Sequence, residues 1–253
     1  RVGDKRAHEL VGSAAAAFSR AAGRPAGGFR YRIEGEVPPA RGLGSSATII
    51  AGVLAGLDEL HRTQLSRHQM AAIGTALEGN PENICAGLLG GFTISRCDPA
   101  TGGYLDTVRV VVPAELVFVV ASPEMELSTK ASRGVLPKSV PFFDAAKSIN
   151  SAAYLTAAFA TGGFEKLCHA VGDFMHEPFR LPQIRGAREA ITAGVAAGAL
   201  CGWLSGSGSS VLCVARPATA SAVATAMHTA FSQVGIASEE RVLGADNDGL
   251  QLE

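Results

Sequence analysis

A short loop between a predicted strand and an apolar helical run restricts this chain more than any other feature. The loop, here the glycine-serine loop, covers residues 38–48 and reads PPARGLGSSAT. Residues 29–36 before it alternate apolar or aromatic with charged side chains, which predicts a strand, and residues 47–60 have the composition of a buried helix. A strand, a loop and a helix in this order place a helix N-terminus and several backbone N–H groups at one spot, which suits a phosphate group.

Two glycines and two serines determine what this loop can do. Gly42 and Gly44 lack a Cβ, so the backbone can turn tightly and approach a ligand. Ser45 or Ser46 is expected to cap the following helix, which leaves the other hydroxyl for a metal or a phosphate oxygen. Because glycine followed by serine is also common capping chemistry, the residue types alone leave a phosphate site and a simple cap both open. A Walker loop is absent from the sequence, and so is a G-x-G-x-x-G motif that opens a helix.

The composition narrows the class of protein. With 253 residues, of which 47% are hydrophobic, the chain can form one large domain or two smaller ones with a sizeable core. The net charge of −1 and the lack of a Lys and Arg run argue against nucleic acid as a partner. No stretch reaches the roughly 20 apolar residues of a membrane span, so no membrane partner is expected. A cytoplasmic location is expected from the cysteines, because buried free thiols suit a reducing compartment. The five cysteines form no C-x-x-C pair, which predicts free thiols.

Helices and strands interleave along the chain without a regular βαβ series, which predicts an α+β fold with helices on one side of a sheet. Besides the segments flanking the loop, helices are expected over 4–22, 66–77, 82–89, 128–135, 142–159, 164–175 and 218–234. Ser66 is expected to cap the helix over 66–77. Strands are expected over 92–96, 105–112, 116–121, 202–204, 210–215 and 240–243. The chain is expected to change domain near Pro113.

The glycine-serine loop resembles the P-x-x-x-G-L-G-S-S-A loop of the GHMP kinases. This resemblance implies the two-domain GHMP kinase fold, in which residues 1–115 form an N-terminal domain like domain 2 of ribosomal protein S5, without its first strands. Residues 116–253 would form a ferredoxin-like C-terminal domain. The resemblance also implies that ATP is bound by Pro38, Arg41, Gly42, Leu43, Gly44, Ser45, Ser46 and Ala47.

A polar turn follows the third expected helix and reads EGNPEN over residues 78–83. Taken alone, it suits the solvated end of a helix. It is similar to the E-G-H-P-D-N turn of the homoserine kinases, a branch of the GHMP family, with Asn80 and Glu82 in place of His and Asp. By this resemblance Glu78 and Ser46 are catalytic residues that bind Mg²⁺, and Asn83 binds the substrate amino acid. Mg²⁺ prefers oxygen ligands and retains several waters, so one carboxylate, one hydroxyl and the nucleotide phosphates are sufficient.

Two later segments match the same branch. Residues 126–137, ELSTKASRGVLP, resemble its S-T-x-x-A-R-x-x-L-P signature, although alone they suit a capped surface helix. The resemblance implies that Thr129 is a catalytic residue near the reacting hydroxyl and that Arg133 binds the substrate carboxylate, which a planar guanidinium can hold through two hydrogen bonds. Residues 173–180, DFMHEPFR, resemble D-x-x-H-x-P-x-R, which implies a second carboxylate-binding arginine at Arg180. Without the resemblance, Arg180 is a surface residue that follows a proline.

The last matching motif is GSGS over residues 206–209, between two expected strands. It resembles the third motif of the family, commonly S-G-S-G-P, and it also suits a simple glycine hairpin. By the resemblance this loop borders the active site and helps to hold the glycine-serine loop.

Together these motifs imply an ATP- and Mg²⁺-dependent kinase that phosphorylates the hydroxyl of L-homoserine in threonine biosynthesis. Another GHMP kinase of the mevalonate or isoprenoid type is an alternative, against which the match at residues 126–137 argues. A non-catalytic nucleotide-binding protein is a second alternative, because the P-A-S-x-A-N-L-G-P-G-F-D segment of homoserine kinases does not occur before the loop. A homodimer is also open, since family members are often dimeric and nothing in this sequence decides it.

Overall fold

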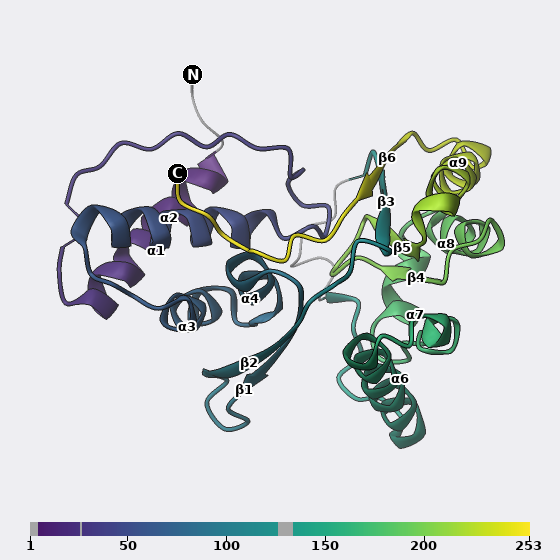
Figure 1. Cartoon of the computed structure of the whole chain (residues 1–253), viewed down its shortest axis with the longest axis horizontal. Coiled ribbons are helices and arrows are strands. Elements are labelled where there is room, and N and C mark those ends of the chain that lie inside the picture. Colours follow the sequence, from purple (N-terminus) through teal and green to yellow (C-terminus); the bar gives the residue numbers. More distant parts are fainter. Residues whose placement is uncertain (1–4, 26, 126–133) are drawn as a thin grey trace. The chain divides into compact units, whose positions relative to one another are not determined.

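The computed structural model of the chain describes residues 5–25, 27–125 and 134–253 (Figure 1). The described helices are α1 (Lys5–Ala22), α2 (Ser45–His61), α3 (Arg67–Glu78), α4 (Glu82–Leu89), α6 (Phe142–Thr161), α7 (Glu177–Arg180), α8 (Ala187–Ala196) and α9 (Pro217–Gln233). Two short 3-10 helices are η1 (Phe164–His169) and η2 (Leu181–Gln183). The strands are β1 (Phe92–Cys97), β2 (Tyr104–Val110), β3 (Val117–Pro123), β4 (Cys201–Leu204), β5 (Val211–Ala215) and β6 (Ser238–Leu243).

These elements form two compact units that are interleaved in the sequence. Unit 1 comprises Arg1–Val37, Gly44–Val111 and Asp246–Glu253. Unit 2 comprises Pro38–Leu43 and Val112–Ala245. The glycine-serine loop therefore contributes residues to both units.

Unit 1 is built on four helices that share one core. Phe18 from α1, Leu54 from α2 and Leu88 from α4 are fully buried in it. The predicted cap of α3 is confirmed, because the side chain of Ser66 accepts a hydrogen bond from the backbone of Gln69 and the Gln69 side chain accepts one from Ser66. Strands β1 and β2 form an antiparallel hairpin in which Phe92 lies opposite Val110.

The strand predicted over residues 29–36 is wrong. This segment has no strand pairing in the described structure, and Tyr31 and Ile33 are 43% and 47% exposed. A strand requires a hydrogen-bonded neighbour, and the two described strands of unit 1 pair only with each other. Alternation of apolar and polar residues was therefore insufficient evidence for a strand here.

Unit 2 is built on a four-stranded antiparallel sheet in the order β4-β5-β3-β6. Val119 of β3 lies opposite Cys213 of β5 and Val242 of β6, so β3 is paired on both edges. Helices α8 and α9 pack on this sheet, and Figure 1 shows them on the same side of it, as predicted. Phe231 and Met227 of α9 are fully buried in this core.

Two helix predictions in unit 2 need correction. The helix predicted over 164–175 is wrong beyond residue 169, because η1 ends at His169, and the N–H groups of Phe174 and Met175 bond to the side chains of Ser148 and Asp173. Helix α8 was not predicted, although its small apolar residues Ala187, Ala190 and Gly194 recur at helical spacing and are buried. The helix predicted over 128–135 lies largely outside the described residues.

All five cysteines are free, as predicted from their spacing. Cys201 and Cys213 lie in the unit 2 sheet, and burial raises the pKa of each thiol to about 12. These two thiols therefore remain protonated and unreactive near neutral pH.

Candidate active site

The first half of the glycine-serine loop is fixed to unit 2. The backbone N–H of Ser210 donates to the carbonyl of Arg41 over 3.1 Å, and Ser205 Oγ donates to the carbonyl of Gly42 over 2.9 Å. The guanidinium of Arg41 donates to the carbonyl of Pro123 at the end of β3. These bonds confirm the expected contact between the loop at residues 205–210, here the β4–β5 loop, and the glycine-serine loop.

The second half of the loop starts helix α2 in unit 1. Gly44 is the N-cap residue, with φ 74°, and no side chain caps the helix. The predicted serine cap is therefore wrong. The N–H of Thr48 bonds to the carbonyl of Gly44 over 3.1 Å, whereas the N–H groups of the first turn have no partner within a helix. Ala47 is buried and anchors the turn, while residues 41–46 are half-buried.

Ser46 and Glu78 lie together although they are 32 residues apart. Ser46 Oγ donates a hydrogen bond to Glu78 Oε1. Glu78 is the last residue of α3, which ends at Gly79 in a left-handed conformation, with φ 77°. A hydroxyl and a carboxylate are the oxygen ligands that Mg²⁺ prefers, so this pair fits the predicted metal site. In the described ranges no group of three His, Cys, Asp or Glu side chains could hold a metal by itself.

Asn83 lies beside the same loop. A Cβ added to Gly44 would be 3.3 Å from Asn83 Oδ1, so the missing side chain of Gly44 leaves room for this amide. The two residues that depart from the family pattern bond to each other, since Asn80 Nδ2 donates to Glu82 Oε1 over 2.7 Å. Ser46, Glu78 and Asn83 are thus grouped around the start of α2.

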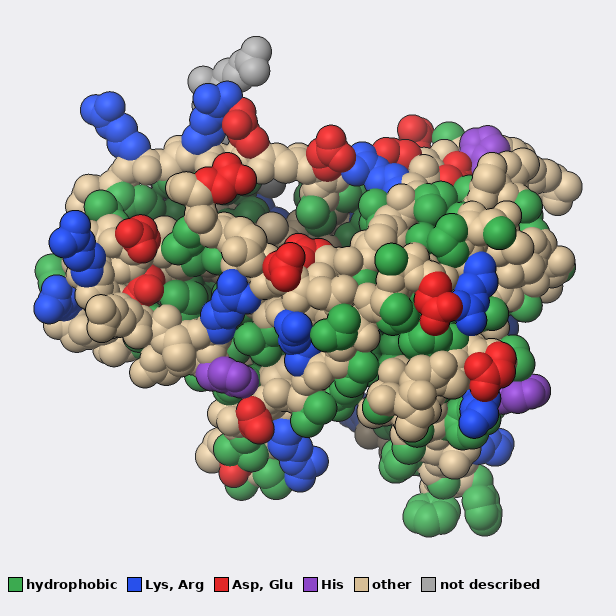
Figure 2. Space-filling view, in the orientation of Figure 1, with side chains coloured by type: hydrophobic (Ala, Val, Ile, Leu, Met, Phe, Trp, Pro, Cys, Tyr) green, Lys and Arg blue, Asp and Glu red, His purple; other side chains and the backbone are tan. Residues whose placement is uncertain are grey.

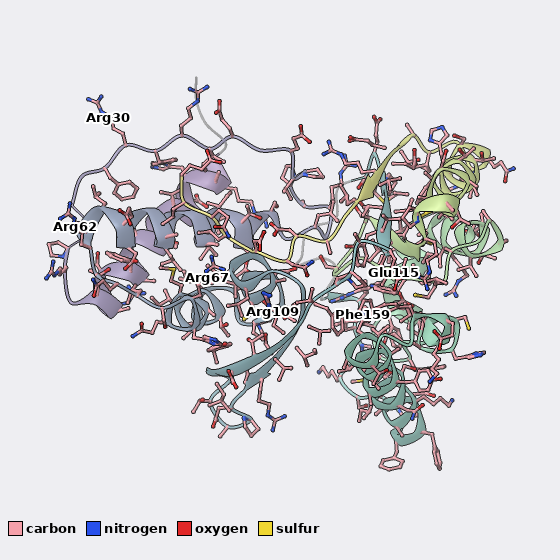
Figure 3. The ribbon with its side chains drawn as sticks, viewed as in Figure 1. Arg30, Arg62, Arg67, Arg109, Glu115 and Phe159 are labelled. Carbon is pink, nitrogen blue, oxygen red and sulfur yellow. The ribbon has the colours of Figure 1, made fainter. Side chains whose placement is uncertain are left out.

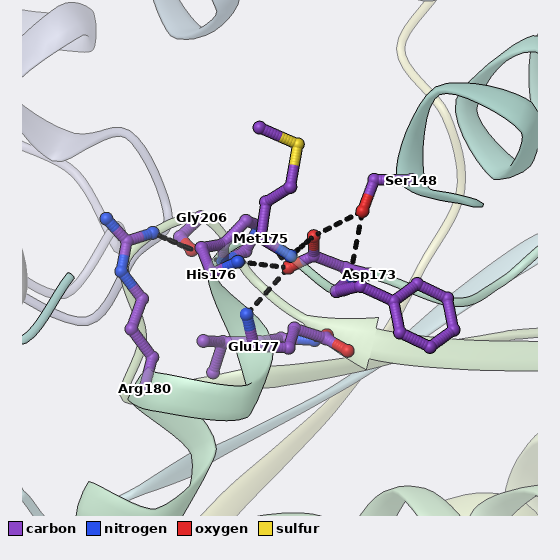
Figure 4. A network of polar contacts seen from close by, with 9 residues as sticks. Ser148, Asp173, Met175, His176, Glu177, Arg180 and Gly206 are labelled. Carbon is purple, nitrogen blue, oxygen red and sulfur yellow. Dashed lines mark hydrogen bonds and ion pairs between the residues drawn. The ribbon is translucent and has the colours of Figure 1, made fainter. Parts of the chain in front are cut away.

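A second group of polar side chains, which includes the predicted site residue Arg180, lies in unit 2 (Figure 4). Arg180 ends the single-turn helix α7, and its Nη1 is 3.4 Å from the carbonyl of Gly206 and 3.4 Å from His176 Nδ1. Arg180 and His176 line a pocket of about 790 Å³, together with apolar side chains that include Leu155, Met175 and Trp203. Thr129 and Arg133 lie outside the described residues.

Three side chains in this group have shifted pKa values. Burial alone would raise the pKa of Asp173, but N–H donors from Glu177, Met175 and His176 prevail and lower it. Burial lowers the pKa of His176, and Arg180 lowers it further against the opposing charge of Asp173. Burial raises the pKa of Glu177 despite a hydrogen bond from the N–H of Leu204. The perturbed groups cluster beside Arg180, as is common at functional sites.

Several residues that support these groups were missed from the sequence. Ser205 and Ser210 hold the glycine-serine loop, and Glu177 ties α7 to the end of β4. The SGSGSS run contains the serines, but their hydroxyls and N–H groups reach residues about 160 positions away. The resemblance predicted that the two loops meet, but it did not indicate which serine groups form the hydrogen bonds.

Elsewhere on the surface, hydrophobic side chains are exposed at one end of α6 (Figure 2). Phe142 and Phe143 are 79% and 75% exposed there.

Within the described ranges, each helix is too short or too polar to cross a bilayer.

The sequence of this chain is similar to those of several known proteins. Residues 9–91 match the family model for the N-terminal domain of GHMP kinases, and residues 155–233 match the model for their C-terminal domain. A homoserine kinase from Moorella thermoacetica is 37% identical over 237 residues, which cover 94% of this chain and 78% of that protein. A homoserine kinase from Microchaete diplosiphon is 38% identical over 220 residues, which cover 87% of this chain and 71% of that protein.

Solved structures show the same fold. The crystal structure of homoserine kinase from Cytophaga hutchinsonii matches with a TM-score of 0.82 at 24% identity, over 95% of this chain and 77% of that one. Phosphomevalonate kinase from Streptococcus pneumoniae matches with a TM-score of 0.65 at 15% identity, over 93% of this chain and 83% of that one.

Proposed function

Because this chain belongs to the GHMP kinase family, we propose that it transfers the γ-phosphoryl group of ATP to the hydroxyl of L-homoserine. The family models and the identity to homoserine kinases confirm the family resemblance, the α+β fold and the kinase class that the motifs predicted. The choice of homoserine over other alcohols is supported by the curated relatives and by the substrate motifs. The observation that carries the proposal is the Ser46–Glu78 pair at the uncapped start of α2.

The glycine-serine loop is the nucleotide site in this proposal. The first N–H groups of α2 need acceptors and lie at the positive end of the helix, so they suit the β- and γ-phosphates of ATP. The residues proposed to contact the nucleotide are Pro38, Arg41, Gly42, Leu43, Gly44, Ser45, Ser46 and Ala47. Arg41 contributes its backbone, because its guanidinium is bonded to the carbonyl of Pro123.

Ser46 and Glu78 are the proposed ligands of Mg²⁺. When bound, the ion neutralises part of the charge on the phosphates. Glu78 accepts a hydrogen bond from the Ser46 hydroxyl and so fixes the direction of that hydroxyl.

The amino-acid substrate is proposed to be held by Asn83, Thr129, Arg133 and Arg180. A guanidinium binds a carboxylate through two parallel hydrogen bonds, which fixes both the position and the direction of the substrate. The homoserine oxygen then forms a bond to the γ-phosphorus, the bond from that phosphorus to the bridging oxygen of ADP breaks, and the hydroxyl proton is released. Phosphoryl transfer depends mainly on such positioning and on charge neutralisation, so no aspartate base is required.

A coupled ADP-release assay with a panel of alcohols tests the proposal. We expect L-homoserine to give the largest kcat/KM, and ³¹P NMR to identify O-phospho-L-homoserine as the product. Faster turnover of mevalonate or another isoprenoid precursor would instead assign a different GHMP activity. Calorimetric binding of ATP without turnover of any alcohol would support a non-catalytic nucleotide-binding protein. We also propose a cytoplasmic location. We further propose that the chain forms a homodimer, and light scattering can measure its oligomeric state.

A further inference from the structure

The carboxylate of Asp173 organises the segment that carries Arg180 (Figure 4). Its Oδ1 accepts the N–H of Met175 over 2.8 Å, and its Oδ2 accepts the N–H groups of His176 and Glu177 over 2.9 and 2.6 Å. Ser148 of α6 supports this turn, because its Oγ accepts the N–H of Phe174 over 2.9 Å. One side chain therefore satisfies three consecutive N–H groups at the entrance to α7.

Helix α7 depends on this entrance because it is only four residues long. So short a helix is not stable by itself. Its first residue, Glu177, has a second anchor, since Oε1 accepts the N–H of Leu204 over 2.6 Å. Its last residue is Arg180, so the start of α7 determines where the guanidinium lies.

The ring of His176 provides a second link between Asp173 and Arg180. His176 Nε2 is 3.2 Å from Asp173 Oδ2, and Nδ1 is 3.4 Å from Arg180 Nη1. An ionised carboxylate only accepts hydrogen bonds, so Nε2 carries the proton in the neutral ring. Nδ1 then presents its lone pair to the guanidinium, which can only donate.

We propose that Asp173 is a positioning residue for the amino-acid substrate, which acts through the start of α7 and through the His176 ring to orient Arg180. The inference rests on the proposed function, in which Arg180 binds the substrate carboxylate. It extends that function by naming the group that fixes the arginine.

The substitution Asp173→Asn tests this role, because asparagine retains one acceptor and loses the other. We expect KM for L-homoserine to rise about tenfold or more, since small misplacements of a binding group are costly, while KM for ATP changes less than about twofold. The ¹⁵N shifts of His176 in the wild-type chain should report the tautomer protonated at Nε2. In the variant this preference should be lost.

Asp98 offers a matched control in the β1–β2 turn. Its Oδ1 likewise accepts two consecutive backbone N–H groups, from Ala100 over 2.9 Å and Thr101 over 2.8 Å. Asp98→Asn should lower the melting temperature by a few degrees at most, with both KM values unchanged.

Each result decides a separate question. An unchanged KM for homoserine in an active Asp173→Asn variant overturns the positioning role. A wild-type His176 protonated at Nδ1 also overturns it, and this measurement does not depend on the variant folding. If the wild-type chain turns over another alcohol and not homoserine, the proposed function fails, and the tautomer still decides whether Asp173 orients the ring toward Arg180.

Discussion

Gly42 is the residue whose backbone most limits substitution. Its φ is 76°, and an added Cβ would lie 2.2 Å from the carbonyl oxygen of Ser205. Gly102 has a similar φ of 72° but open space around it, so it separates backbone strain from collision. We expect Gly102→Ala to cost about 1 kcal/mol of unfolding free energy, and Gly42→Ala to cost at least about 2 kcal/mol and to raise KM for ATP. Urea unfolding and steady-state kinetics measure both, and equal effects would contradict the contact with the β4–β5 loop.

Glu78 is the residue on which the proposed metal dependence can be tested. Glu78→Gln retains an acceptor for the Ser46 hydroxyl but removes the negative charge. We expect the Mg²⁺ concentration for half-maximal rate to rise at least about tenfold, and removal of Mg²⁺ with EDTA to abolish turnover of the wild-type chain. Glu59→Gln, at an exposed position of α2, is the control and should leave the Mg²⁺ dependence unchanged. A normal Mg²⁺ dependence in Glu78→Gln would refute the ligand assignment.

Glu177 has a raised pKa, which predicts a pH-dependent stability. Its ordinary pKa is 4.5, and burial raises the value in the folded chain. The folded state therefore retains the proton more strongly than the unfolded state, and the wild-type chain loses stability as pH rises from 4.5 through the folded pKa. Glu177→Gln keeps an acceptor for Leu204 and has no charge. Relative to the wild type, this variant should be more stable at pH 7 and should lose that advantage near pH 4, as measured by urea unfolding.

The site residues differed in how far the sequence could predict them. Ser46, Glu78 and Asn83 were assigned by short motifs, and the structure brings them to the start of α2. Their roles in binding Mg²⁺ and the substrate stay predictions. Asp173 belongs to the matched D-x-x-H-x-P-x-R segment, but the motif did not indicate its bonds to backbone N–H groups. The bond from Ser205 to the carbonyl of Gly42 was not indicated either, so both roles required the fold.

Among the elements, the C-terminal segment after β6 is bound by two arginines of unit 1 (Figure 3). Arg67 donates to the carbonyls of Asp248 and Leu250 over 2.8 and 2.7 Å, and Arg109 donates to the carbonyl of Asn247 over 2.9 Å. The segment lies against the end of α4, since a Cβ on Gly90 would be 2.5 Å from the N of Gly249. It therefore supports the helix whose first turn carries Asn83.

We expect Arg67→Ala to lower the unfolding free energy by about 1–3 kcal/mol, because two charge-assisted bonds to the segment are lost. Arg30→Ala changes an exposed arginine and should alter the unfolding free energy by less than about 0.5 kcal/mol. Chemical denaturation compares the two variants. Similar values would mean that the two bonds from Arg67 to the segment do not stabilise unit 1.

Most elements were predictable because their signals are local. Ser66 indicated the start of α3, and the apolar run after the glycine-serine loop indicated α2. The failures had non-local causes. Residues 29–36 lack a pairing partner among the described strands, and the N–H groups of Phe174 and Met175 bond to the side chains of Ser148 and Asp173 instead of to a helical turn.

For the whole molecule, the division of the glycine-serine loop between the two units predicts how nucleotide binding should change their stability. Residues 38–43 belong to unit 2 and residues from Gly44 onward to unit 1, so a nucleotide held by the loop should stabilise both. At a concentration 100 times Kd, about 2.7 kcal/mol is expected. Trp203, the single tryptophan, reports unit 2 by fluorescence, and amide exchange in α3 reports unit 1. Mg·ATP should raise the stability seen by both probes, and a response confined to one would contradict a shared loop.

The interleaving of the two units also limits how the gene can be divided. A fragment that stops at residue 115 would lack the final eight residues that cover the end of α4, and its residues 38–43 would lack Ser205 and Ser210. In a fragment that starts at residue 116, Ser205 and Ser210 would lose their hydrogen-bond partners, the carbonyls of Gly42 and Arg41. Split-gene complementation or domain exchange at that point should therefore yield insoluble halves, whereas inserts in the exposed β1–β2 turn leave all of these contacts in place.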